Sequence, residues 1–290
     1  MKIILGKTAG FCHGVTRAVE EAESIIENSN TIYCLGDLVH NEQVISKLRK
    51  KGLKVIENIE EAPKHATVII RAHGVPDKVY IQAEQKEIKL VDLTCVKVLN
   101  IHKQAKEYAN QGYYIFLIAE KKHPETIGTI SFCGQDSYII QESEDIDCAL
   151  DQWKKSKKQK LLILSQTTFS LTKFDKIVSE ITSKLDSNIE VEIKKTICNA
   201  TNLRQKETKE LAQTVDCMII IGGTKSSNTR KLYEIAKENC NDTIFIQTKE
   251  DLAIEKIRKY HKIGVMAGAS TPKESIEDVI QWIERDKVCI

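Results

Sequence analysis

The sequence predicts an α/β protein built on parallel sheets, and two observations lead to this fold class. Short apolar runs alternate with segments of helical character, and most of the runs are hydrophobic throughout rather than at every second position. Continuous hydrophobicity is typical of strands that are buried on both faces of a parallel sheet. The predicted strands lie in KIILG, TIYCLGD, TVIIRAHG, IKLVDLT, YYIFLIAE, LLILSQTT, CMIIIGGT, IFIQT and KIGVMAGAS.

Small and polar residues follow most of these runs at their carboxyl ends. In open α/β sheets, ligands bind in the crevice beyond the carboxyl ends of the strands. A binding site is therefore expected around the residues that follow the strands, namely Gly36-Asp37, His73-Gly74, His123 to Glu125, Gln166 to Thr168, Gly222 to Asn228 and Gly268 to Ser270.

The composition favours a small-molecule partner and argues against a nucleic acid or a membrane. The 290 residues include 43 basic and 41 acidic side chains, a net charge of +2, and the two signs are interspersed. The longest apolar run, at 113–119, is too short for a membrane helix of roughly 20 residues. Gly6 and Lys7 interrupt the first apolar run before the core of a signal peptide can form, so a cytoplasmic location is expected.

The cysteines point to a metal or to catalysis rather than to disulfides. A reducing cytosol keeps thiols reduced, and nine cysteines leave one over in any pairing. The sequence contains no C-x-x-C pair, which excludes zinc ribbons, thioredoxin-like motifs and bacterial ferredoxin runs. Any metal site must therefore be assembled from cysteines that are far apart in the sequence.

Cys12, Cys95 and Cys198 share a context, in which a strand-like run leads to the cysteine and a helical segment follows. They lie about 80–100 residues apart, roughly one small α/β unit each. Zinc is disfavoured because structural zinc usually has four protein ligands, whereas an iron–sulfur cubane held by three cysteines leaves one iron open. We expect structural or incidental roles for the other six, which are Cys34, Cys133, Cys148, Cys217, Cys240 and Cys289. The stretch 151–160 reads as a basic, linker-like turn.

Nine collinear motifs resemble those of the 4-hydroxy-3-methylbut-2-enyl diphosphate reductases, the IspH/LytB family. The first motif, GFCHGVTRA, is similar to the family signature G-F-C-x-G-V-x-R-A. The resemblance continues in order over essentially the whole chain. The later motifs are VHNEQV, RAHGVP, DLTC, HPETIGT, SQTTFS, CNATNLRQ, GGTKSSNT and AGAS.

The resemblance implies three similar small α/β domains in a trefoil around a central iron–sulfur cluster. The expected domains are residues 14–97, residues 98–194, and residues 1–13 with 195–290. The implied cofactor is a [4Fe–4S] cluster with three cysteine ligands, Cys12, Cys95 and Cys198, and one open iron.

The implied reaction is the reductive dehydroxylation of 4-hydroxy-3-methylbut-2-enyl diphosphate, an allylic diphosphate, to isopentenyl and dimethylallyl diphosphates. It is the last step of the non-mevalonate isoprenoid pathway. The reaction consumes two electrons and two protons, and the electron donor implied by analogy is a ferredoxin or a flavodoxin. The leaving hydroxide must be protonated or bound by a Lewis acid, which the open iron can supply.

The resemblance also implies roles for individual residues. Glu125 is the candidate proton donor, and Thr167 or Thr168 relays or orients the proton, with Thr167 favoured. Ser226 and Asn228 also suit a helix N-cap, and the two roles are compatible. The residues expected to bind the substrate are His40, His73, His123, Thr168, Ser226, Ser227, Asn228 and Ser270.

Two positions depart from the family pattern. Val96 replaces a usual proline, which should alter the rigidity of the turn, and Ile127 replaces a usual acidic residue, which removes a possible supporting carboxylate. Among the remaining histidines, His102 is undecided and the others, His13, His65 and His261, are expected to be incidental.

Two alternative functions are weighed against the reductase. An aconitase-like hydro-lyase or a quinolinate-synthase-like enzyme would need arginines that bind a carboxylate substrate, whereas this sequence places histidine and serine/asparagine clusters at the strand ends. A non-catalytic redox or iron-sensing protein would need no buried acid in a preformed pocket.

Overall fold

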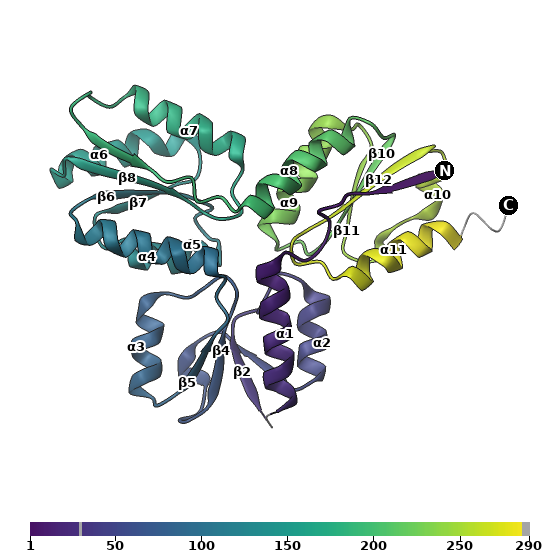
Figure 1. Cartoon of the computed structure of the whole chain (residues 1–290), viewed down its shortest axis with the longest axis horizontal. Helices are drawn as coiled ribbons and strands as arrows, with labels where there is room; N and C mark the ends of the chain where they lie inside the picture. The colour runs from purple at the N-terminus through teal and green to yellow at the C-terminus, as the bar shows by residue number, and fades with distance from the viewer. Residues whose placement is uncertain (29–30, 286–290) are drawn as a thin grey trace. The chain divides into compact units, whose positions relative to one another are not determined.

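The predicted α/β class is confirmed by the computed structural model, which describes residues 1–28 and 31–285. These residues form three separate four-stranded sheets, in which every pair of neighbouring strands is parallel (Figure 1). The sheets, in spatial order, are β1 (Lys2–Leu5), β12 (Lys262–Ala267), β10 (Cys217–Ile221) and β11 (Thr243–Ile246); β3 (Leu53–Ile56), β2 (Ile32–Leu35), β4 (Thr67–Ile70) and β5 (Lys89–Asp92); and β7 (Ser137–Ile140), β6 (Tyr114–Ile118), β8 (Lys160–Ser165) and β9 (Glu190–Ile193).

Helices connect the strands, as parallel pairing requires. Short 3₁₀ turns at Ile59–Glu61, Ser143–Asp145 and Lys249–Asp251 complete the connections. The helices are α1 (His13–Glu27), α2 (Glu42–Lys50), α3 (Asp77–Gln85), α4 (Val96–Asn110), α5 (Pro124–Phe132), α6 (Ile146–Ser156), α7 (Leu171–Ser183), α8 (Asn199–Ala212), α9 (Ser227–Asn239), α10 (Ile254–Ile257) and α11 (Lys273–Arg285).

The chain divides into two units, and each is described by itself. Unit 1 comprises Met1–Thr16, Val39–Lys47 and the described part of Asn199–Ile290, and it contains the sheet of β1, β12, β10 and β11. Unit 2 comprises Arg17–Leu38 and Leu48–Cys198, and it contains the other two sheets. The three-domain boundaries expected from the sequence stay a prediction.

The central strands are buried on both faces, which explains their continuous hydrophobicity. In β6, Phe116 points into a core shared with α6 and α7, whereas its neighbour Leu117 points into a second core shared with α4. Figure 1 shows this sheet between the α6 and α7 layer and the α4 and α5 layer. In unit 1, alternate residues of β10 do the same, since Ile219 packs with α11 and Ile220 packs with α9.

Three edge strands, β3, β7 and β9, are absent from the list of predicted apolar runs, although β9 lies in the strand-like run before Cys198. Each is the last strand of its sheet, and none of them is buried along its whole length. In β3 the exposed Lys54 interrupts the apolar residues, and β7 begins with the half-buried Ser137. Strands at the edge of a sheet tolerate such polar residues, so continuous hydrophobicity does not detect them.

The prediction that residues 151–160 form a linker-like turn is wrong. Helix α6 extends to Ser156, and only residues 157–159 separate it from β8. The helix persists because Ile146, Leu150 and Trp153 recur at helical spacing and are buried against the sheet. The basic residues of this stretch occupy the solvent side of that helix and the turn.

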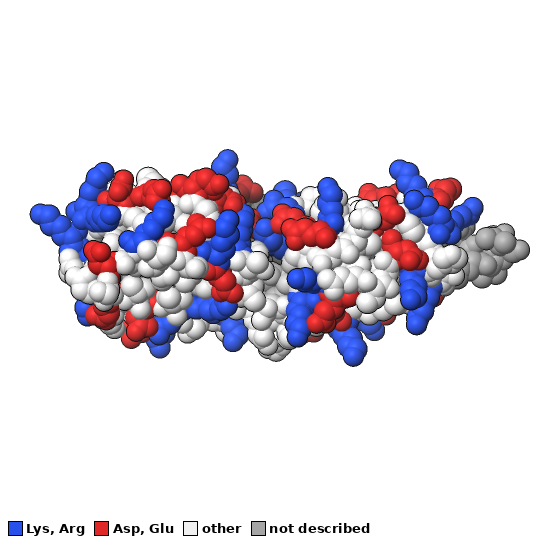
Figure 2. All heavy atoms as spheres, turned by 90° about the horizontal axis from the view of Figure 1, so that it is seen from above, with Lys and Arg blue, Asp and Glu red and all other residues white. Residues whose placement is uncertain are grey.

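The surface carries mixed charge, and no described helix is long and apolar enough to cross a bilayer. On the face drawn in Figure 2, basic and acidic side chains are interspersed without a large area of one sign. This distribution matches the nearly balanced count of charged residues in the sequence.

Candidate active site

The residues singled out at strand ends occupy the carboxyl ends of parallel strands in both units. In unit 2, His73 follows β4, His123 follows β6, and Thr167 follows β8. In unit 1, Ser226 follows β10 and Ser270 follows β12. Side chains placed there can converge because parallel strands all end at the same edge of a sheet.

Glu125 and Thr167 form a buried pair in unit 2. The Thr167 backbone N–H donates to Oε1 of Glu125 at 2.7 Å, and the Thr167 hydroxyl donates to Oε2 at 2.6 Å. Glu125 is only 2% exposed. Burial raises the pKa of Glu125 to about 7; the bonds from Thr167 oppose this rise and the nearby Glu120 adds to it. A carboxyl group with this pKa can give up or hold a proton near neutral pH.

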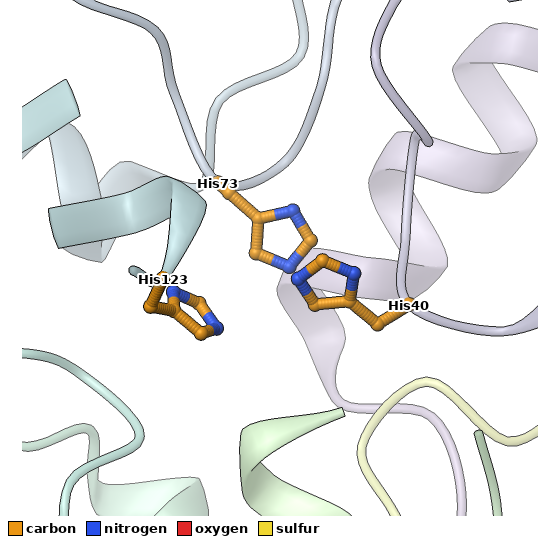
Figure 3. Close-up of side chains that lie close together, drawn as sticks. All are labelled: His40, His73 and His123. Atoms are coloured by element: carbon orange, nitrogen blue, oxygen red, sulfur yellow. The ribbon is translucent and has the colours of Figure 1, made fainter. Parts of the chain in front are cut away.

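His123 precedes Glu125 and caps helix α5. Its Nδ1 accepts from the Glu125 backbone N–H at 3.1 Å. The neutral ring then carries its hydrogen on Nε2, which makes that atom a donor. The His73 ring lies edge-on to the His123 ring, with centroids 5.6 Å apart and an interplanar angle of 78° (Figure 3). Unit 2 therefore brings two of the predicted substrate histidines together beside Glu125.

Thr168 is bonded to Gln166. Its hydroxyl accepts from Nε2 of Gln166 at 2.8 Å, while Oε1 of Gln166 accepts from the Glu120 backbone N–H at 2.9 Å. Gln166 is 2% exposed and links the ends of β6 and β8. No role was assigned to this residue from the sequence, although its place after a buried strand was a signal for one. Of the two threonines that the sequence left open, only Thr167 donates to the carboxyl group.

Two of the three cysteines are anchored by their backbone beside these residues. The Cys95 backbone N–H donates to the Ala72 carbonyl at 3.0 Å, one residue before His73. The Cys198 backbone N–H donates to the Thr167 carbonyl at 2.9 Å. Both side chains are half-buried. Unit 2 thus holds Cys95 next to the His73 segment and Cys198 next to the Glu125–Thr167 pair.

Unit 1 holds the third cysteine and five of the predicted substrate residues. The Cys12 backbone N–H donates to the Ala269 carbonyl at 3.2 Å, and the next residue, Ser270, donates through its hydroxyl to the His40 carbonyl at 3.1 Å. Gly223 packs against the same carbonyl, since a Cβ atom at Gly223 would lie 2.4 Å from the His40 oxygen. The ends of β10 and β12 therefore enclose the His40 segment, whose ring is drawn in Figure 3.

The start of α9 fits an anion. Ser226 is the N-cap, and its hydroxyl accepts from the Thr229 N–H at 3.2 Å, which confirms the capping role. Asn228 is 3% exposed, yet neither atom of its side-chain amide has a hydrogen-bond partner within the described residues. Such a buried amide is costly unless a ligand satisfies it. Backbone N–H groups and the helix dipole also favour negative charge at this end of α9.

Residues 3–284 of the chain match the sequence pattern of a family described as LytB protein. The chain belongs to the LytB family.

Full-length relatives support this membership. Over 285 residues this LytB chain is 41% identical to the 4-hydroxy-3-methylbut-2-enyl diphosphate reductase of Clostridioides difficile. The aligned region covers 98% of this chain and 99% of the relative. The LytB chain is also 41% identical over 286 residues to the protein of the same name from Aquifex aeolicus, with 97% and 96% coverage.

Solved structures of the same type resemble the LytB chain along nearly its whole length. The E-1-hydroxy-2-methyl-but-2-enyl-4-diphosphate reductase of Plasmodium falciparum gives a TM-score of 0.89 at 29% identity, covering 97% of this chain and 87% of that one. A structure of (E)-4-hydroxy-3-methyl-but-2-enyl diphosphate reductase, described as the terminal enzyme of the non-mevalonate pathway, gives 0.71 at 39% identity, with 98% and 100% coverage.

Membership of the LytB family implies an iron–sulfur cofactor, and three cysteines of this LytB chain suit one. Cys12, Cys95 and Cys198 are half-buried, and each directly precedes a helix. Thiolates bind iron, so a ligand must be able to lose its proton. Burial instead raises the pKa of three other thiols, those of Cys34, Cys133 and Cys217, to about 12.

Two further described cysteines have other positions. Cys148 is exposed on α6, and Cys240 is buried at the end of α9. Cys289 lies outside the described residues.

The structure also places the four histidines to which no substrate role was assigned. His13, His65 and His261 are exposed. His102, which the sequence left undecided, is 4% exposed and stacks on Phe132 with centroids 4.3 Å apart. Burial lowers the pKa of His102 to about 4, so its ring stays neutral, and it fills the space beside Gly74, where a Cβ would lie 2.8 Å from the ring.

Both departures from the family pattern are exposed side chains. Val96 is the first residue of α4 and is 54% exposed, and Ile127 lies on α5 and is 48% exposed. Neither side chain is part of the buried Glu125–Thr167 pair.

Replacing Asn228 by Ala should weaken substrate binding without weakening the fold. With the diphosphate for which the relatives are named, we expect KM to rise about tenfold or more, because a hydrogen bond to a charged group is lost. The melting temperature should not fall, since the buried amide has no partner within the described residues. The exposed Asn241→Ala is the control for steady-state kinetics and thermal melting. An unchanged KM would remove Asn228 from the binding site.

Proposed function

We propose that this protein is a 4-hydroxy-3-methylbut-2-enyl diphosphate reductase. It removes the allylic hydroxyl group as water, using two electrons and two protons, and yields isopentenyl and dimethylallyl diphosphates as the last step of the non-mevalonate pathway. The observation that carries this proposal is the buried Glu125, bonded twice to Thr167, in a chain whose full-length relatives bear this name. Departing hydroxide needs a proton, and a carboxyl group with a pKa of about 7 can supply it.

Cys12, Cys95 and Cys198 are proposed to hold a [4Fe–4S] cluster that leaves one iron without a protein ligand. Their half-buried thiols and their positions before α1, α4 and α8 support this assignment. When bound, such a cluster supplies the electrons and a Lewis acid for the substrate oxygen. Substrate binding and proton transfer are assigned to side chains of the protein.

The predicted substrate residues are proposed to hold the diphosphate. The donor at Nε2 of His123, the amide of Asn228 and the start of α9 support this role, because each can donate to phosphate oxygens. The full proposed set is His40, His73, His123, Thr168, Ser226, Ser227, Asn228 and Ser270.

Glu125 is proposed as the proton donor and Thr167 as the residue that orients and relays the proton. The hydroxyl of Thr167 bonds to Oε2 at 2.6 Å, whereas Thr168 is engaged by Gln166. A bound diphosphate adds negative charge, which raises the pKa of Glu125 further and keeps the carboxyl group protonated until it reacts.

Electrons are proposed to come from a small redox protein such as a ferredoxin or a flavodoxin. The cytoplasmic location and the three-domain division at residues 14–97, 98–194 and 1–13 with 195–290 also stay proposals. The three separate parallel sheets support the division, since each expected domain contains the strands of one sheet.

The direct test is an anaerobic assay with a reduced viologen dye. Rapid dye oxidation on addition of 4-hydroxy-3-methylbut-2-enyl diphosphate is expected from protein that carries its cluster. Cluster-loaded protein that oxidises no dye with this substrate would overturn the proposed function, and a redox or sensing role would replace it.

Exchanging each threonine for valine should separate the two neighbours. Thr167→Val removes the hydroxyl that donates to Glu125, and we expect turnover to fall about tenfold or more. Thr168→Val removes only the bond from Gln166 and should change KM more than turnover. Single-turnover rates with saturating substrate measure the difference. A larger loss in Thr168→Val would reverse the assignment.

A further inference from the structure

Helix α8 holds the loop that leads to Cys12. Glu207 on α8 accepts three hydrogen bonds from this loop, including the Lys7 N–H to Oε1 at 2.6 Å and the Thr8 N–H to Oε2 at 2.8 Å; the Thr8 hydroxyl gives the third. Burial raises the pKa of Glu207, but these bonds outweigh burial and the net pKa lies below the ordinary value. The side chain therefore stays an ionised acceptor near neutral pH.

Arg204, one turn earlier on α8, holds the same loop at a second point. It is 4% exposed, and its Nη2 donates to the Gly10 carbonyl at 2.6 Å. Its Nη1 donates to the Ala200 carbonyl at 3.0 Å, within the first turn of α8. The guanidinium thus ties Gly10, two residues before Cys12, to the start of the helix that directly follows Cys198.

Strand β12 and the segment after it hold the other side of the loop. The N–H groups of Gly6, Gly10 and Cys12 donate to the carbonyls of Val265, Ala267 and Ala269, at 2.9, 3.4 and 3.2 Å. The N–H groups of the intervening Lys7 and Thr8 go to Glu207. Without Arg204 and Glu207, the loop would lose its described hydrogen bonds to α8 and keep those to β12 and the segment after it.

We propose that Arg204 and Glu207 are positioning residues that hold Cys12 ready to ligate the iron–sulfur cluster. The inference rests on the proposed function, because it requires Cys12 to be a ligand. A ligand whose backbone is already ordered loses little entropy on binding, and its bond to iron re-forms quickly after each opening. The clamp formed by Arg204 and Glu207 should therefore slow the loss of iron.

The test compares Glu207→Ala with Glu210→Ala, a matched change at an exposed position of the same helix. Hydrogen exchange of the cluster-free protein measures the order of residues 6–12. Transfer of iron to a chelator, well below the melting temperature, measures cluster retention in loaded protein. Glu207→Ala should lose protection at residues 6–12 and release iron about tenfold faster than wild type or more, because three hydrogen bonds are removed and the loss of one is worth up to about tenfold. Glu210→Ala should match wild type in both measurements.

A milder variant, Thr8→Val, removes only the hydroxyl bond and should shift both readouts in the same direction by less. It takes the place of Glu207→Ala in both measurements if that protein does not fold. Unchanged hydrogen exchange, or lost protection with a wild-type rate of iron release, would overturn the inference. Wild-type protein that takes up no cluster would instead overturn the proposed function and the inference with it.

Discussion

Replacing Glu125 by Gln is expected to lower turnover about 100-fold or more, with little change in cluster content or substrate affinity. The variant keeps the shape of the side chain and can keep both contacts to Thr167, since its amide oxygen accepts from the N–H and its amide nitrogen donates to the hydroxyl. What it loses is a proton that can be given up near neutral pH.

Anaerobic steady-state kinetics and iron analysis on the same preparation measure this effect. The matched control is Glu107→Gln, which makes the same change at an exposed position on α4. Its turnover should stay within about twofold of wild type. Turnover near the wild-type value in Glu125→Gln would exclude Glu125 as the proton donor.

The pH dependence gives a second signature of the same group. The acid must be protonated to act, and the pKa of Glu125 is about 7, so kcat/KM of wild type should fall as pH rises above about 7. The residual activity of Glu125→Gln should lack this decline. A wild-type profile that is flat between pH 6 and 9 would contradict the assignment.

Stability should respond to the same ionisation. The pKa of Glu125 in the folded protein lies above its unfolded value of 4.5. Between pH 4.5 and about 7 the folded state therefore binds more protons than the unfolded state, and stability falls as pH rises through this range. The difference between the folded and unfolded pKa values lowers the free energy of unfolding by about 3 kcal/mol once pH exceeds the folded pKa. Glu125→Gln removes this destabilisation. Its melting temperature relative to wild type should therefore be higher at pH 8 than at pH 5.

Serine in place of Cys12, Cys95 or Cys198 is expected to lower bound iron and sulfide several-fold. Serine keeps the size of the side chain, but its hydroxyl stays protonated where a thiolate would form, so it is a poor ligand for iron. Turnover should fall with the cluster, because the cluster supplies the electrons.

The matched control is Cys148→Ser, at an exposed position on α6. A buried cysteine such as Cys34 is less suitable, since a hydroxyl group there would destabilise the core. Iron and sulfide are measured after anaerobic reconstitution under identical conditions. Equal contents in Cys12→Ser and Cys148→Ser would exclude Cys12 from the ligand set.

The fold class was predictable from the sequence. Uninterrupted apolar runs require strands that are covered on both faces, as in β6 and β10, and parallel strands bring their polar ends to one edge. The edge strands β3 and β7 escaped detection because a strand that is covered less needs no continuous apolar run. The helical end of α6 escaped because its lysines conceal the buried spacing of Leu150 and Trp153.

Only the tertiary structure decided which neighbouring side chains act together. Thr167 and Thr168 are adjacent and chemically alike, but successive residues after a strand point in different directions, so only Thr167 reaches Glu125. The contacts of Glu207 with Lys7 and Thr8 join residues that are 200 and 199 positions apart. The sequence by itself determined the fold class and the candidate residues because burial leaves a local pattern. Hydrogen bonds between distant segments leave none, and the structure alone could supply them.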